Sequence, residues 1–450
     1  MNDCRGNPVQ TRSGAALDHA ERALWRLMTF YGTPLDDLEA AQAADPQWVM
    51  PALMKAGFLL GLSEAGFARE GTAVLDAIAP EALASASERE QAHHRALREL
   101  AAGRWDDACA SWGRLLERHP RDALALQWAH LFDFYRGDAA NLRERAARVL
   151  PAWDAADPLH PHVLAIHAFG LEEAGHYAEA EATGRRALDG DPKAPWAVHA
   201  VAHVMEMQGR HDEGSHWLRQ RRPQWSVGNG FAVHLGWHQA LFALERLDGD
   251  EALALLDEHM AAARMTVTLE RLDAAALLWR LHLLGMDVGP RWRELLEAWD
   301  PSPAEAGHYA FNDWHALLVM LGAGEAGRAQ TWLQAAERQA ASGAGTNRAM
   351  AEQVGLPLMR GACAFAQGRA KDALGAIAPV RAVAHRFGGS HAQRDLIDQT
   401  LMAAAAMAGE RSAGLALLDR REAGRGTTPL NARWRTRFDP GPAARVMPPL

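Results

Sequence analysis

The sequence predicts an all-α protein built from helix-turn-helix repeats that stack into a curved solenoid. Three observations indicate this fold class. Apolar residues recur at helical spacing along most of the 450-residue chain, with Gly, Pro or Asp between the segments. No stretch shows the sustained β-branched alternation that is typical of strands. Turn-like glycines 34 residues apart indicate a repeating unit.

The predicted elements begin after a polar segment, residues 1–14, which we expect to be disordered. A helix follows in ALDHAERALWRLMTFYG and stops at Gly32. A second helix, LDDLEAAQAADP, ends at Asp45 and Pro46. Short amphipathic helices then continue, and because repeats bury their apolar faces against each other, we expect residues 15–423 to form a single solenoid. Residues 424–450 are rich in proline, and we expect an irregular tail packed on the solenoid end.

The repeat period comes from glycines between paired helices. Gly103 and Gly137 are 34 residues apart, and so are Gly175 and Gly209. A glycine at this position ends the first helix and allows a left-handed turn. Later units keep a turn but have longer intervals, and we place their turns at Gly249, Gly324, Gly368 and Gly409. Residues 162–192, which contain EAGHYAEAEATGRRALDGDP, resemble the tetratricopeptide repeat, a unit of two antiparallel helices.

Composition excludes several classes of function. A net charge of −9 leaves no broad cationic surface for nucleic acid. The cysteines Cys4, Cys109 and Cys363 form no C-x-x-C pair, which argues against a disulfide framework or a thiolate zinc site. The N-terminus lacks the apolar core of a secretory signal, and no run approaches the roughly 18 apolar residues of a membrane span. We therefore expect a soluble, cytoplasmic protein.

Histidines are the most distinctive feature of the chain. Ten of the 21 lie in the 79 residues from His160 to His238, where even spacing would place fewer than four. His199 and His203 are four residues apart, as are His234 and His238, so each pair lies on one face of a helix. With Gly209 as an inter-helix turn, the two pairs fall on the first helices of consecutive units. Four imidazoles are then expected to converge.

A metal or acid/base centre is the functional interpretation of these imidazoles. Neutral imidazole is the commonest metal ligand, and three or four nitrogen or oxygen ligands describe a zinc or iron site. Glu206, one turn after His203, is a candidate to orient a ligand. H-E-x-x-H, G-x-S-x-G and phosphate-loop motifs are absent. The structural interpretation is that the histidines are partly buried groove residues, and that the nearby tryptophans are core residues between repeats.

Three blocks carry a closer resemblance: HAVAHVMEMQGRHDEG at 199–214, HLGWHQALFALERLDGDEALALLD at 234–257 and FNDWHALLVMLGAG at 311–324. Together they resemble the tetratricopeptide repeat protein 38 family over most of the chain. The resemblance implies a cytosolic helical-repeat protein, and it carries no established reaction, substrate or cofactor. The polar set that it implies is His199, His203, His234, His238, Asn312, Asp313 and His315.

Three functions follow as hypotheses. The preferred one is a concave groove that binds a small molecule or a peptide end through the polar set together with Trp237 and Trp314. The second is a metal-dependent enzyme, hydrolase-like or lyase-like, in which His199, His203, His234 and His238 hold a divalent ion such as zinc or iron. The third is a protein-protein interaction scaffold, the usual role of repeat proteins.

Overall fold

A computed structural model describes residues 1–438, and these residues are all-α, as the sequence predicts. They contain no β-strand and only two isolated bridges, Asn2 to Pro8 and Tyr31 to Asn229. The chain divides into two compact units. The first comprises residues 1–201 and 223–231, and the second comprises residues 202–222 and those from 232 onward. The single continuous solenoid suggested for residues 15–423 remains a prediction.

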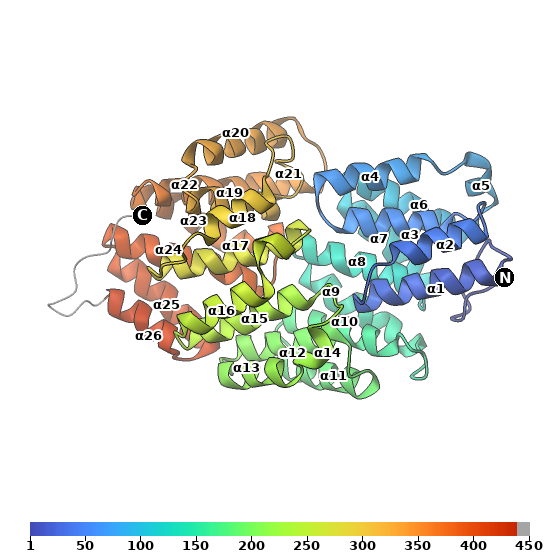
Figure 1. Cartoon of the computed structure of the whole chain (residues 1–450), viewed down its shortest axis with the longest axis horizontal. Coiled ribbons are helices and arrows are strands. Elements are labelled where there is room, and N and C mark those ends of the chain that lie inside the picture. Colours follow the sequence, from blue (N-terminus) through green and yellow to red (C-terminus); the bar gives the residue numbers. More distant parts are fainter. Residues whose placement is uncertain (439–450) are drawn as a thin grey trace. The chain divides into compact units, whose positions relative to one another are not determined.

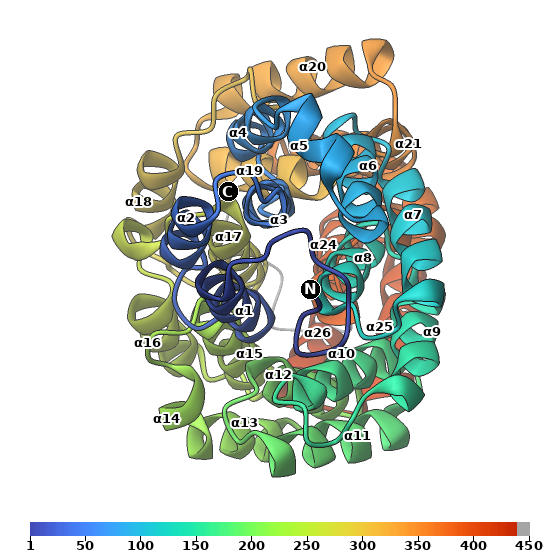
Figure 2. The same ribbon diagram turned by 90° about the vertical axis from the view of Figure 1, so that its right-hand side faces the viewer.

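The first unit consists of antiparallel helices that follow one another in chain order (Figure 1). Helices α6 to α11 each pack on the next, and Figure 2 shows them side by side. Two helices, α12 (Pro195–Met207) and α14 (Arg222–Trp225), run across the division between the units. The other helices of this unit are α1 (Gly14–Thr29), α2 (Leu35–Ala44), α3 (Met50–Gly61), α4 (Ala65–Asp76), α5 (Pro80–Ser85), α6 (Glu88–Ala101), α7 (Trp105–Arg118), α8 (Ala123–Tyr135), α9 (Ala139–Val149), the 3₁₀ helix η1 (Leu150–Ala152), α10 (His160–Glu173) and α11 (Tyr177–Gly190).

The second unit is also a succession of helix pairs (Figure 1). Its helices are α13 (His211–Gln220), α15 (Ala232–Glu245), α16 (Gly249–His259), the 3₁₀ helix η2 (Ala262–Arg264), α17 (Thr268–Leu283), α18 (Arg291–Trp299), α19 (Ala310–Gly322), α20 (Ala326–Ser342), α21 (Thr346–Met350), the π-helix η3 (Ala351–Gly355), α22 (Leu356–Ala366), α23 (Ala370–Ile377), the 3₁₀ helix η4 (Ala378–Phe387), α24 (His391–Ala408), α25 (Arg411–Arg425) and α26 (Pro429–Phe438). Helix α17 is central, because it packs on α15, α18, α19 and α24.

A left-handed residue ends the first helix of each pair. At Gly209 φ is 72°, and the N–H groups of Gly209 and Arg210 donate to the carbonyls of Glu206 and Met205 over 3.1 and 2.8 Å. These two bonds satisfy carbonyls that the end of α12 would otherwise leave exposed. Gly175 closes α10 with the same pair of bonds. The predicted 34-residue helix-turn-helix unit is therefore present at these positions.

The turn of the next pair differs from the prediction. Leu247, with φ of 59°, takes the left-handed position that we assigned to Gly249. Asp248 caps the following helix by accepting the N–H of Glu251 over 3.0 Å, so the turn lies one residue before the cap. Gly249 instead opens α16, where a Cβ would overlap the Met286 methyl group. Its glycine is needed for packing.

Additional turns that the glycine pattern did not identify lie at Ser63 and Gly285, with φ of 56° and 75°. Turn residues 209, 247 and 285 are spaced 38 apart, and 137 and 175 share that interval. A search for 34-residue spacing alone misses these pairs, because the added residues lie between the helices.

The two chain ends also differ from expectation. Residues 1–13, expected to be disordered, are held by polar contacts: Asp3 Oδ1 accepts the N–H groups of Arg5 and Asn7, and the Arg5 guanidinium pairs with Glu21 at 2.5 Å. Part of the expected irregular tail forms helix α26, whose Trp434 is fully buried. The last residues of that tail, 439–450, lie outside the described part of the chain.

The cores contain many tryptophans and alanines. Ala168, Phe169 and Ala200 form a closely packed cluster in the first unit, since small side chains let neighbouring helices approach. Trp237, Trp279 and Trp314 are fully buried in the second. Among residues 1–438, no helix is long and apolar enough to cross a bilayer.

The turn geometry predicts different costs for two similar substitutions. In Gly175→Ala the new methyl group meets nothing, so only the left-handed conformation costs stability, about 1 kcal/mol. In Gly209→Ala the methyl group would also overlap the carbonyl of Arg425, which adds at least about 2 kcal/mol. Urea unfolding followed by circular dichroism measures both changes. Equal losses of stability would contradict the close approach of Gly209 to α25.

Candidate metal centre

Three histidines come together in the second unit from two first helices. His203 lies on α12, six residues before the turn at Gly209, and His234 and His238 lie four residues apart on α15, before the turn at Leu247. The His203 and His238 ring centres are 4.4 Å apart, and those of His234 and His238 are 4.8 Å apart. One ring nitrogen from each of the three lies within 4.8 Å of the others. This spacing matches a candidate metal site.

Burial differs among the three. His203 and His238 are fully buried, whereas the His234 side chain retains 17% of its exposure. Two imidazoles thus lie in the protein interior and one lies at its edge. Solvent reaches this cluster beside His234.

His199 lies one turn before His203 on α12 and is 2% exposed. Within the first unit its ring packs among Phe169, Trp196 and Phe231, with centroid distances of 5.2, 5.0 and 4.9 Å. The aromatic rings hold the imidazole of His199 in place on the helix face that it shares with His203. The predicted convergence of all four imidazoles stays a prediction.

Two buried carboxylates orient the imidazoles of α15. His234 Nδ1 lies 2.7 Å from Asp273 Oδ2, and His238 Nδ1 lies 3.1 Å from Glu206 Oε2. An Nδ1–H that donates to a carboxylate fixes the tautomer whose lone pair is on Nε2. Asp273 and Glu206 are 1% and 2% exposed. The sequence suggested this role for Glu206, but it did not identify Asp273.

Electrostatics favour the neutral form of His238. Burial holds its pKa well below 6.5, and the charges of His234 and Arg280 lower it further. A neutral imidazole is the form that binds a metal. Burial also raises the pKa of Glu206, while the positive charge of Arg425 opposes that rise. The positive charges near Glu206 therefore favour its ionised form.

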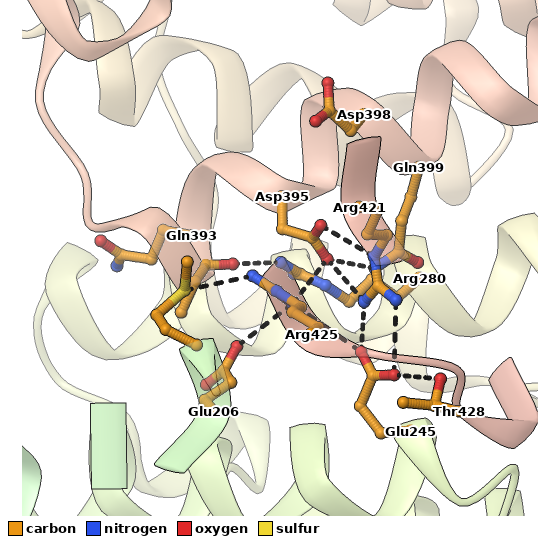
Figure 3. A network of polar contacts seen from close by, with 12 residues as sticks. Glu206, Glu245, Arg280, Gln393, Asp395, Asp398, Gln399, Arg421, Arg425 and Thr428 are labelled. Carbon is orange, nitrogen blue, oxygen red and sulfur yellow. Dashed lines mark hydrogen bonds and ion pairs between the residues drawn. The ribbon is translucent and has the colours of Figure 1, made fainter. Parts of the chain in front are cut away.

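Glu206 belongs to a buried network of arginines and carboxylates in the second unit (Figure 3). Arg425 Nη1 lies 3.7 Å from Glu206, 3.8 Å from Glu245 and 3.3 Å from Asp395. Arg421 pairs with Glu245 and binds both oxygens of Asp395, at 3.0 and 3.1 Å. All of these side chains are at most 9% exposed. The sequence analysis missed them, although the unbroken DRREAGR of α25 was a possible signal.

A third arginine lies beside the cluster without a carboxylate hydrogen bond in the described structure. Arg280 donates to the carbonyls of Ala276 and Ala392 over 3.1 and 2.8 Å, and its guanidinium lies 5.5 Å from the Trp237 ring centre. Burial lowers the pKa of Arg280 to about 10, so it remains charged at neutral pH. Trp237 itself stacks on His234, with centroids 5.3 Å apart.

The predicted residues of α19 lie in the same unit with partners of their own. Both Asp313 oxygens accept the Gly307 N–H, over 3.0 and 3.1 Å, and His315 Nδ1–H donates to the Phe311 carbonyl over 2.8 Å. Asn312 is 9% exposed, and Trp314 packs beside His315 with centroids 5.0 Å apart. Burial raises the pKa of Asp313 to about 7 and lowers that of His315 to about 4.

No protein-family model matches the chain. Solved structures with similar folds include the crystal structure of the APC/C hetero-tetramer Cut9-Hcn1, with 13% identity, a TM-score of 0.47 and coverage of 97% of this chain and 79% of that one. A tetratricopeptide repeat protein from Parabacteroides merdae has 15% identity and a TM-score of 0.34, and covers 65% of this chain and 99% of its own. A human IFIT1 dimer with PPP-AAAA has 12% identity, a TM-score of 0.40 and coverage of 91% and 88%.

The raised pKa of Asp313 predicts a pH effect on stability. The unfolded carboxyl group ionises near pH 3.8, whereas the folded one keeps its proton up to about pH 7. The unfolded state thus binds fewer protons in this window, and wild-type stability falls as pH rises from about 4 to about 7. Asp313→Asn has no such slope, so we expect its stability relative to wild type to rise by up to roughly 4 kcal/mol across the window.

Chemical unfolding at a series of pH values measures this difference. Asp300→Asn is the matched control, because Asp300 is exposed and its left-handed backbone accommodates asparagine. Parallel pH profiles for Asp313→Asn and wild type would contradict the prediction.

Proposed function

We propose that this helical-repeat protein binds a divalent metal, most suitably zinc, through His203, His234 and His238. The observation that supports the proposal is the pair of hydrogen bonds from the α15 imidazoles to Asp273 and Glu206. Metal-bound histidines commonly donate the other ring N–H to a carboxylate, which fixes the ring and makes the ligand more basic. Two such pairs in one buried cluster are more specific than the histidine spacing alone.

The chemistry of the donors fits zinc. Tetrahedral zinc holds its nitrogens at about 2.0 to 2.1 Å, so neighbouring nitrogens lie roughly 3.3 Å apart. The ring nitrogens lie within 4.8 Å, and modest side-chain rotations would bring them to that distance. Iron sites of the facial type need a carboxylate ligand. Asp273, bound to His234, would have to leave its partner to supply one, which makes iron the second choice.

Charge also supports a cation in this place. Burying a carboxylate without a compensating positive charge is costly. Arg425 lies near Glu206, but the direct partner of Asp273 is the His234 imidazole, and its Oδ1 is buried without a hydrogen bond among the described residues. A metal bound to His234 would supply positive charge on the far side of that ring. The negative charge of Asp273 would then be balanced through the imidazole.

His199 determines which kind of metal site this is. We extend the proposed ligand set to His199 because it lies one turn before His203 on α12. Four protein ligands would make a closed structural site, whereas three would leave a position for water near the exposed edge of His234. In the second case the metal would lower the pKa of its bound water, and the protein would be a metal-dependent enzyme of the hydrolase or lyase type.

A binding pocket for a small molecule or a peptide end is the second candidate. It is supported by polar atoms that are buried without partners in the described structure, His315 Nε2 and Trp237 Nε1. A ligand lined by Trp237, Trp314 and the polar residues of α19 would satisfy such groups. A protein-protein scaffold remains the third candidate, in line with the helical-repeat fold. The free cysteines Cys4, Cys109 and Cys363 fit the proposed cytoplasmic location.

Metal analysis of untagged protein tests the proposal. We expect one zinc per chain after reconstitution, and a lower melting temperature after chelation, because a ligand that binds only the folded state stabilises it. His203→Ala and His238→Gln should weaken zinc binding at least about 100-fold, since each removes a direct ligand. His282→Gln is the control, because His282 lies on α17 and packs against Trp279. It should keep full stoichiometry.

A gain of signal complements these losses. In His203→Cys loaded with cobalt, a thiolate replaces one imidazole, so a sulfur-to-cobalt charge-transfer band should appear. The same experiment on His199→Cys shows whether His199 is a ligand. Zinc-free wild type in the presence of excess zinc, or a cobalt spectrum that His203→Cys leaves unchanged, would refute the metal site.

A further inference from the structure

Arg425 is the last residue of α25, more than 180 residues after the proposed metal ligands in the chain. We propose that Arg425 is a positioning residue of the metal centre: it holds Glu206, and Glu206 orients His238. This inference rests on the metal site proposed above. It assigns a functional role to a helix that contributes no ligand of its own.

The contacts form a short series within the second unit. Arg425 Nη1 lies 3.7 Å from Glu206 Oε1, and the other oxygen of the same carboxylate lies 3.1 Å from His238 Nδ1. One carboxylate thus connects the guanidinium to the imidazole, with one oxygen toward each. Glu206 is 2% exposed and Arg425 is 6% exposed, so water screens this pairing little.

Several contacts hold Arg425 in place. Its Nη2 lies 3.6 Å from Met207 Sδ, next to Glu206, and its carbonyl packs against Gly209 so closely that a Cβ there would overlap it. Asp395 at 3.3 Å and Glu245 at 3.8 Å hold the guanidinium from the other side (Figure 3). The turn after α12 and the end of α25 therefore pack as one element. Glu206 has little freedom to rotate away from His238.

The competing explanation is that the arginines only balance buried acids. Arg421 serves as a matched control, because it lies on the same helix and is equally buried. Its ion pairs in the described structure are with Glu245 and Asp395, and its further hydrogen bond is to Asn431. Both arginines stabilise the interior by charge balance, but Arg425 also contacts the carboxylate that binds His238. The two explanations therefore differ in what an Arg425 substitution does at His238.

The test compares Arg425→Gln, Arg425→Lys, Glu206→Gln and the double variant Arg425→Gln/Glu206→Gln. Zinc affinity is measured by competition with a chromophoric chelator. We expect Arg425→Gln to weaken zinc binding about 10-fold to 100-fold, the range for partners that orient metal ligands. Arg425→Lys should restore affinity to within about 3-fold, because a lysine ammonium can still pair with Glu206. In the Glu206→Gln background, Arg425→Gln should cause no further loss.

A second measurement uses metal-free protein. Nitrogen-15 spectra of the histidine side chains report whether His238 keeps its proton on Nδ1. Arg425→Gln should shift the His238 signals or mix the tautomers, and Arg421→Lys should leave them unchanged while lowering the melting temperature. This arm keeps its meaning if wild type binds no zinc, so failure of the metal site and failure of the positioning role can be told apart.

Either of two results would overturn the positioning role. One is an Arg425→Gln variant that is less stable but has unchanged zinc affinity and unchanged His238 signals. The other is a loss of affinity that is equally large with and without Glu206. If the Gln variant does not fold, Arg425→Met in the presence of a stabilising osmolyte and the Lys variant provide the same comparison.

Discussion

The left-handed residue between paired helices is the constraint on which the positions of the site residues depend. It ends the first helix, directs the chain back, and thereby sets which face of that helix points into the unit. His203 lies six residues before Gly209, and His238 lies nine residues before Leu247. Moving either turn by one residue would rotate the imidazoles by about 100° around their helix. Gly209 carries a second constraint, because α25 packs directly on it.

The buried ions are the second organising feature. Three arginines and the carboxylates of Glu206, Glu245 and Asp395 lie inside one unit, and Asp273 lies beside His234. A buried ion pair is rarely a net source of stability, since desolvation offsets the attraction. Arg421 keeps the pKa of Asp395 well below its usual range even though burial acts in the opposite direction. A network that maintains ionised carboxylates next to imidazoles is suited to orienting ligands.

The predictability of the site followed the distance between interacting residues in the chain. The i, i+4 histidine pairs and their helices could be predicted because both are local properties. The role of Glu206 was accessible as a hypothesis, since it lies three residues after His203. Asp273 and Arg425 were not accessible, because an acidic or basic residue on an amphipathic helix is usually solvated. The N-terminal segment was misjudged for a related reason: its order comes from polar contacts such as that of Arg5 with Glu21, which leave no apolar pattern.

The sequence by itself determined the all-α repeat architecture, the pairing of consecutive helices and the placement of His203, His234 and His238 on first helices. Helical periodicity and turn-forming residues act over a few positions, so they can be seen in the chain. Only the tertiary structure decided that Asp273 and Glu206 accept the imidazole N–H groups, and that Arg425 meets Glu206. Those contacts join residues that are distant in the chain, and their strength comes from burial, which exists only after the helices have packed.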